Sequence, residues 1–189
     1  MHAAGLVLGL TICLLSFQLA LDRHFVRAGK MPRSAMGIAI LSAAVYLAAI
    51  VRLWTHGAPS SAFALVATAL MIGSFGLFHA TRRSSPPRCL PVAFEDAAPE
   101  RLVAEGPHGY IRHPFYLSYM LYWAAAFFSA PSLLVGIGAL SIVVVYVVLA
   151  GREERKLLES AIGPAYREYR QRTGRFLPRP SAFLRGGRT

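Results

Sequence analysis

Long apolar runs separated by short polar segments dominate the chain. Three runs of about 20 residues occupy its first half, at positions 3–21, 35–53 and 60–80. Because an α-helix rises 1.5 Å per residue, a run of this length crosses a hydrocarbon core of about 30 Å. A shorter run at 115–130 and a fifth at 133–150 follow. The pattern predicts an all-α integral membrane protein with about five transmembrane helices.

The fourth and fifth runs meet at Ser129-Ala130-Pro131-Ser132, a short uncharged segment that is typical of a tight turn. These runs are therefore predicted to form a helical hairpin, in which the shorter helix need not span the membrane fully. Beyond the fifth run, apolar and aromatic positions recur at near-helical spacing among many charges. We expect the fifth helix to continue to about Ile162 and to be interrupted at Gly163-Pro164, because proline disfavours helix in the residue before it. A short helix to about Arg172 should follow.

A single domain, 1–189, is expected, organised around the segment that precedes the hairpin. Its predicted parts are a scaffold of three helices (1–81), a cytoplasmic loop with the first motif (82–114), the hairpin (115–150), a cytoplasmic helical cap (151–180) and a loose tail (181–189).

Composition and charge support a membrane protein. The chain is 55% hydrophobic and only 15% charged, whereas soluble domains average about a quarter charged. A net charge of +11 would suggest nucleic acid as the partner of a soluble protein. In a chain with these apolar runs it indicates membrane lipids as partners and no nucleic acid.

The distribution of lysine and arginine predicts the orientation. With five crossings, all of the 20 Lys and Arg residues except Arg52 fall on the side of the C-terminal tail. The positive-inside rule then puts the N-terminus outside and the tail in the cytoplasm. Abundant alanine and an excess of arginine over lysine indicate a bacterial source, so we expect the inner membrane.

Candidate chemistry begins with the segment 106–116, which carries glycines, prolines, histidines, tyrosines and Arg112 between apolar runs. Polar groups in such a place are costly and are usually functional. Arg112 and His113 precede Pro114, which suits the first turn of a helix, and the free N–H groups of that turn favour an anion. In the alternative interpretation, Arg112 reaches the lipid headgroups and His113 caps the helix.

Glu153 and Glu154 close the fifth run. Two acids near a helix C-terminus oppose the helix dipole, so a compensating cation is expected from Arg112, a tail arginine or a ligand. In the alternative, they pair with their neighbours Arg152, Arg155 and Lys156.

Tyrosines flank both charged segments. Tyr110, Tyr116, Tyr166 and Tyr169 lie beside the charges, where their rings could stack on an adenine or contact a cation. Tyr119 and Tyr122 are better explained by packing. No metal site is expected, because His108 and His113 are five residues apart without a third ligand nearby.

Four motifs occur in series. They are Gly106-Pro107-x-Gly109-Tyr110-Ile111-Arg112-His113-Pro114-x-Tyr116, Glu153-Glu154-x-x-Leu157, Gly163-x-x-Tyr166-x-x-Tyr169 and Arg175-Phe176-Leu177-Pro178. In order and spacing this series resembles the signature of isoprenylcysteine carboxyl methyltransferases and related membrane phospholipid methyltransferases, over about residues 100–180. Ser118 stands where that family usually has glycine.

The resemblance implies a methyltransferase that holds S-adenosylmethionine at the cytoplasmic mouth of the last two membrane helices, capped by the C-terminal segment. The cofactor-binding residues implied are His108, Tyr110, Ile111, Arg112, His113, Pro114, Tyr116, Leu117, Glu153, Glu154, Tyr166 and Tyr169. The acceptor is expected to be lipophilic, with a carboxylate, an amine or a thiol as the methylated group. Arg170 could orient a carboxylate, and a glutamate of the second motif could take a proton from an amine.

Two other functions stay open. Sterol reductases resemble the C-terminal region too, so an NADPH-dependent membrane reductase is one alternative, although such enzymes normally carry more membrane helices. A non-enzymatic membrane protein whose basic tail binds anionic lipid is the other.

Overall fold

The structure is a computed structural model that describes residues 3–24, 33–85 and 102–179. The predicted loose tail and about half of the predicted cytoplasmic loop lie outside the described residues. Within them the chain is helical and has no strand. The elements are α1 (Ala3–His24), α2 (Arg33–His56), α3 (Ser61–Ser84), a short 3-10 turn η1 (Gly106–Gly109), α4 (Pro114–Ser129), α5 (Leu133–Glu159) and α6 (Gly163–Arg172).

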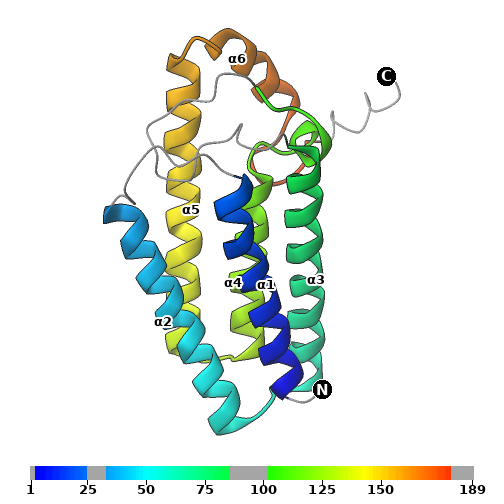
Figure 1. Cartoon of the computed structure of the whole chain (residues 1–189), viewed down its shortest axis with the longest axis vertical. Coiled ribbons are helices and arrows are strands. Elements are labelled where there is room, and N and C mark those ends of the chain that lie inside the picture. Colours follow the sequence, from blue (N-terminus) through cyan, green and yellow to red (C-terminus); the bar gives the residue numbers. More distant parts are fainter. Residues whose placement is uncertain (1–2, 25–32, 86–101, 180–189) are drawn as a thin grey trace.

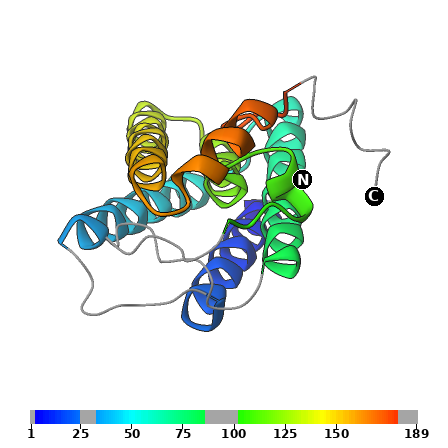
Figure 2. The ribbon, with the colours of Figure 1, turned by 90° about the horizontal axis from the view of Figure 1, so that it is seen from above.

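Helices α1 to α5 alternate in direction along one bundle axis, and α6 lies across one end (Figure 1). Seen from above, α6 runs from the end of α5 toward α3 (Figure 2). Among the described residues, α1, α2, α3 and α5 are long and apolar enough to cross a membrane. This confirms the predicted class, an all-α protein compatible with several membrane crossings.

Helix α4 is shorter than the other bundle helices. Its 16 residues extend about 24 Å at 1.5 Å per residue, less than a hydrocarbon core of about 30 Å. The hairpin turn that follows is closed by Ser132, whose side chain accepts a hydrogen bond from the backbone N–H of Val135 at 3.3 Å. Helices α4 and α5 therefore lie side by side as the predicted hairpin.

The bundle packs through aromatic and small residues around α3 and α4. Phe17 of α1 contacts Phe78 of α3 with ring centroids 4.5 Å apart, and the ring of Tyr122 lies 5.7 Å from Phe17. Large apolar side chains such as Leu65 and Leu133 are exposed on the outside of the bundle. Such a surface is unfavourable in water but matches the acyl chains of a bilayer.

The charged C-terminal segment begins as a continuation of α5. The helix passes from its apolar part to the charged residues and ends at Glu159, three residues before the expected position. A turn follows in which the N–H of Gly163 donates to the carbonyl of Ser160 at 2.9 Å. Pro164 then occupies the first turn of α6, where its missing donor is harmless.

Candidate functional site

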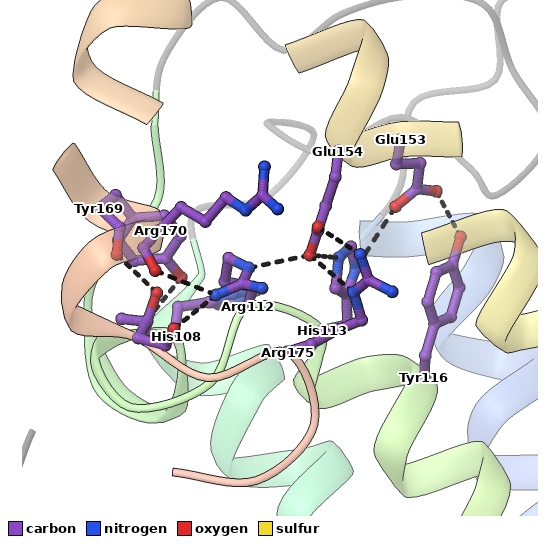
Figure 3. A network of polar contacts seen from close by, with 10 residues as sticks. His108, Arg112, His113, Tyr116, Glu153, Glu154, Tyr169, Arg170 and Arg175 are labelled. Carbon is purple, nitrogen blue, oxygen red and sulfur yellow. Dashed lines mark hydrogen bonds and ion pairs between the residues drawn. The ribbon is translucent and has the colours of Figure 1, made fainter. Parts of the chain in front are cut away.

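A buried ion pair joins the two charged motifs at the end of the bundle where α4 begins and α5 leaves the apolar core. Arg112 immediately precedes α4, and its Nε lies 2.8 Å from Oε1 of Glu154 on α5. Both side chains are less than a tenth exposed, at 6% and 3%. Figure 3 shows Arg112 and Glu154 pointing toward each other from opposite sides of the site.

Glu154 has two further partners. Arg175 donates from Nη2 to Oε2 at 2.7 Å and from Nε to Oε1 at 3.1 Å. Nε2 of His113 lies 3.3 Å from Oε1. A buried carboxylate is tolerated only when its lost hydration is replaced, and two guanidinium groups with an imidazole replace it here.

Backbone pairing brings Arg175 to this place. The N–H of Arg112 donates to the carbonyl of Gly174 at 2.8 Å, the N–H of Gly174 donates to the carbonyl of Tyr110 at 3.1 Å, and the N–H of His113 donates to the carbonyl of Arg175 at 3.2 Å. These bonds form an isolated parallel bridge between Ile111 and Gly174. Glycine is needed at 174, because a Cβ there would lie 1.6 Å from the carbonyl oxygen of Leu177.

Arg112 also binds the end of α6. Nη1 of Arg112 donates to the carbonyl of Thr173 and, at 3.4 Å, to the carbonyl of Arg170. The hydroxyl of Thr173 donates to the carbonyl of Tyr169, and the hydroxyl of Tyr169 donates to the carbonyl of His108 at 2.6 Å. Segments from η1, α6 and the following residues are thus held around one guanidinium.

Glu153, adjacent in sequence, has a different environment. Its side chain is 40% exposed, and its Oε1 accepts a hydrogen bond from the hydroxyl of Tyr116. Nδ1 of His113 lies 3.6 Å from Oε2. The rings of His113 and Tyr116 stack with centroids 5.5 Å apart and planes 6° apart, and Tyr146 stacks on Tyr116 at 5.4 Å. The ring centroid of Phe176 lies 5.9 Å from that of His113. A carboxylate against several aromatic faces is a favourable environment for a cation.

Burial shifts the pKa values of His108 and Tyr169, which lie beside the network. Burial, and secondly the charge of His113, lower the pKa of His108 to about 4, so its imidazole is neutral near neutral pH. Burial raises the pKa of Tyr169 to about 12. Hydrogen bonds to Glu154 raise the pKa of Arg175 above its usual value.

Two buried polar atoms beside the network have no hydrogen-bond partner within the described part of the chain. They are Nε2 of His108 and the hydroxyl of Tyr166. Buried polar groups are normally hydrogen-bonded, so an unpaired donor or acceptor calls for a water or a ligand.

The structure brings most of the predicted site residues together. Arg112, His113, Tyr116, Glu153 and Glu154 form the network, and Tyr166 and Tyr169 are buried on α6 above it. The others line the same end of the bundle: His108 is buried on η1, Ile111 is buried in the bridge, Pro114 is the first residue of α4, Leu117 is half-buried and Tyr110 is half-exposed. Arg170 is exposed and contributes only its backbone carbonyl, which accepts from Arg112.

The contacts of Glu154, Arg112 and His113 bear on the alternative interpretations. Glu154 pairs with Arg112 and Arg175 rather than with its sequence neighbours, and Arg112 is buried rather than extended toward headgroups. His113 occupies the N-cap position of α4 without a side-chain capping bond. Among the described residues, no three potential ligands form a group that could hold a metal ion.

Two residues of the network are absent from the predicted site. Arg175 opens the fourth motif, and a tail arginine was expected near the acids, so the sequence carried a signal for it. Thr173 acts through its backbone carbonyl, for which side-chain chemistry gives no signal.

No family model matches the chain, and no curated protein matches it.

Proposed function

We propose that this chain is an S-adenosylmethionine-dependent methyltransferase that acts on a lipophilic acceptor at a membrane surface, as its resemblance to isoprenylcysteine carboxyl methyltransferases and membrane phospholipid methyltransferases implies. One observation carries the proposal. The first, second and fourth motifs, far apart in sequence, meet in the contacts of Arg112, Glu154 and Arg175. The convergence of these separate motifs at one end of the bundle supports a common site for them.

The residues present suit the chemical groups of this cofactor. Glu153, half-exposed against the rings of Tyr116 and His113, suits a positively charged group such as the cofactor's ammonium. Arg112 and Arg175 suit its carboxylate. The unpaired Nε2 of His108 and hydroxyl of Tyr166 offer further polar contacts at the same end of the bundle. When bound, the cofactor supplies an electrophilic methyl group on a positively charged sulfur.

The chain itself contributes orientation and exclusion of water. Arg112 is fixed by Glu154 and by two backbone carbonyls, so its donors are already oriented before a ligand arrives. The bridge between Ile111 and Gly174 closes the C-terminal segment over the network, which removes water from one side. Alignment of two reactants in such a place supplies most of what methyl transfer requires.

The acceptor group determines whether a base is needed. A carboxylate is already ionised near neutral pH and needs none, and the exposed Arg170 could orient it. An amine must lose a proton, for which Glu153 is half-exposed and His108 is neutral. Both types of acceptor are compatible with the described residues.

For the membrane arrangement we propose five crossings, with α4 as the short one, the N-terminus outside and the α6 segment in the cytoplasm. Arg82 and Arg83 end α3 at the same end of the bundle as the network, and Arg52 lies near the end of α2 at the other. The positive-inside rule favours this orientation, in a bacterial inner membrane if the source is bacterial. A local thinning of the bilayer would accommodate α4.

The proposal is tested by calorimetry or thermal shift on the full chain in detergent, with S-adenosylmethionine, its demethylated product and NADPH as separate ligands. The first two should bind and NADPH should not. Binding of NADPH alone would support a reductase instead, and the absence of any binding would support a lipid-binding protein. Transfer of a labelled methyl group into a total lipid extract, analysed by mass, would then identify the acceptor.

A further inference from the structure

We infer that residues 175–179 form a membrane anchor, with Leu177 at its tip, that inserts into the leaflet beside the charged network. The partner is the lipid bilayer, at the boundary between its headgroups and its acyl chains. The inference rests on the proposed membrane arrangement, in which α4 crosses the bilayer. It does not depend on the proposed methyltransferase activity.

Leu177 is the starting observation, because its side chain is 75% exposed in a segment that is held at both ends. Before it, Gly174 forms the parallel bridge with Ile111. After it, Arg179 donates from Nη1 to the carbonyl of Gln171 at 2.7 Å. Between these points the chain turns so closely that a Cβ on Gly174 would lie 1.6 Å from the carbonyl oxygen of Leu177. The leucine is therefore presented by a closed loop.

The position of this loop along the bundle determines what Leu177 faces. The bridge lies three residues before Pro114, where α4 begins. The 16 residues of α4 extend about 24 Å, less than a hydrocarbon core of about 30 Å. The first turn of α4 must then lie at or inside the edge of the apolar layer. Residues that pair with the start of α4 are consequently at the membrane surface.

Phe176 shows that the loop extends from the network toward the apolar layer. Its ring centroid lies 5.9 Å from that of His113, and its side chain packs against the cluster formed by Tyr116, Leu149 and Ala150. Leu149 and Ala150 precede the two acids of α5 by one helical turn, on the apolar side. The residue after Phe176 is thus placed beside lipid rather than above it.

The composition of the loop fits a boundary with anionic lipids. A lone exposed leucine is common on any protein surface, but here the sequence is Arg-Phe-Leu-Pro-Arg, with no acid between positions 173 and 179. Arg179 is exposed and forms no ion pair within the described part of the chain. At such a boundary an arginine keeps its stem in the apolar layer and its charge among the headgroups, which attract it when they are anionic.

The test measures the depth of position 177 in a bilayer. Leu177→Cys is made in the full chain together with Cys13→Ala and Cys89→Ala, labelled with a nitroxide and reconstituted into vesicles of phosphatidylglycerol and phosphatidylcholine. Electron paramagnetic resonance compares collisions of the label with oxygen, which concentrates among acyl chains, and with a water-soluble nickel chelate. The label at position 177 should collide more with oxygen than with the chelate.

Two control positions bracket this result. Leu140→Cys, on an exposed apolar face of α5, should report the acyl layer, and Ala165→Cys, exposed in the first turn of α6, should report water. The ratio of the two collision rates for Leu177→Cys should resemble that of Leu140→Cys. Because all three side chains are exposed, the labels should leave the unfolding temperature unchanged, which is measured for each variant.

The outcomes separate the anchor from the proposals on which the article builds. A label at position 177 that behaves like Ala165→Cys, while Leu140→Cys reports lipid, overturns the anchor alone. A label shielded from both reagents would indicate contact with protein and also overturns it. If Leu140→Cys reports water, the proposed membrane arrangement fails and the anchor fails with it. A chain that does not bind S-adenosylmethionine but shows the expected depth would refute the methyltransferase proposal and support the anchor.

Discussion

Two neighbouring carboxylates of α5 divide the charged end of the bundle into two unlike halves. The half around Glu154 is cationic and shielded from solvent, because two arginines and a histidine surround a side chain that is 3% exposed. Around Glu153 it is aromatic and open, with a side chain that is 40% exposed. The difference indicates that the first half holds the cap in place, whereas the second half has carboxylate capacity left for a ligand.

The largest expected effect comes from Glu154→Gln. It would leave Arg112 buried without a counter-ion, which typically costs about 3–5 kcal/mol of stability. Thermal unfolding in detergent measures the loss. If the variant unfolds at the wild-type temperature, the closed half does not stabilise the fold.

The next effect concerns the backbone that delivers Arg175. In Gly174→Ala the new Cβ would meet the carbonyl oxygen of Leu177, so the backbone must shift, at about 1–3 kcal/mol. Proteolysis of the C-terminal segment should become faster, and the unfolding temperature should fall. Gly151→Ala is the matched control, because a Cβ there meets no atom within 4 Å and alanine favours a helix. Equal behaviour of the two variants would contradict the need for glycine at 174.

Glu153→Gln should weaken ligand binding and leave stability almost unchanged, which is the reverse of the effect expected for Glu154→Gln. Because this side chain is half-exposed and makes no buried guanidinium pair within the described residues, stability should change by less than about 1 kcal/mol. Affinity for S-adenosylmethionine, measured by calorimetry, should fall by about 10-fold or more through loss of a charged partner. Unchanged affinity would remove Glu153 from the proposed pocket.

The smallest effect is a dependence on pH. The folded pKa of His108 is about 4, below the unfolded value of about 6.5, so the unfolded state binds the proton more readily. Its contribution to stability is complete above about pH 6.5 and is lost as the pH falls toward 4, amounting to about 1 kcal/mol between about pH 7 and pH 5.5. Unfolding of the wild type and of His108→Gln at several pH values measures it. Parallel pH profiles would show that another group titrates.

Sequence reasoning anticipated the helical class and much of the network, for physical reasons. Apolar run length fixes where helices can form, and the unfavourable placement of two acids demanded a cation, which Arg112 supplies. It left the tail arginine beside the acids unnamed. Arg175 makes that contact, and the sequence pattern could not single it out because the pairing of Gly174 with the first motif is a backbone effect. It also took α5 too far, since the turn before Pro164 needs residues of its own.

The sequence pattern also gave no signal for the unpaired hydroxyl of Tyr122 in the described part of the chain. The spacing of Tyr122 correctly indicated packing of its ring. A pattern of apolar positions gives no account of a single hydroxyl, which has no hydrogen-bond partner among the described residues.

The parallel bridge between Ile111 and Gly174 has a consequence for biogenesis. Arg175 follows Glu154 by 21 residues, so during synthesis the hairpin can leave the translocon while this carboxylate still lacks its second guanidinium. In the proposed membrane arrangement, docking of the C-terminal segment would be the last step of maturation, and a membrane-inserted but immature form would precede it. We expect chains truncated before Thr173 and released from the ribosome to resist alkaline extraction from the membrane yet to be cleaved readily near α6. Truncated chains that resist such cleavage would show that α6 is secured without the bridge.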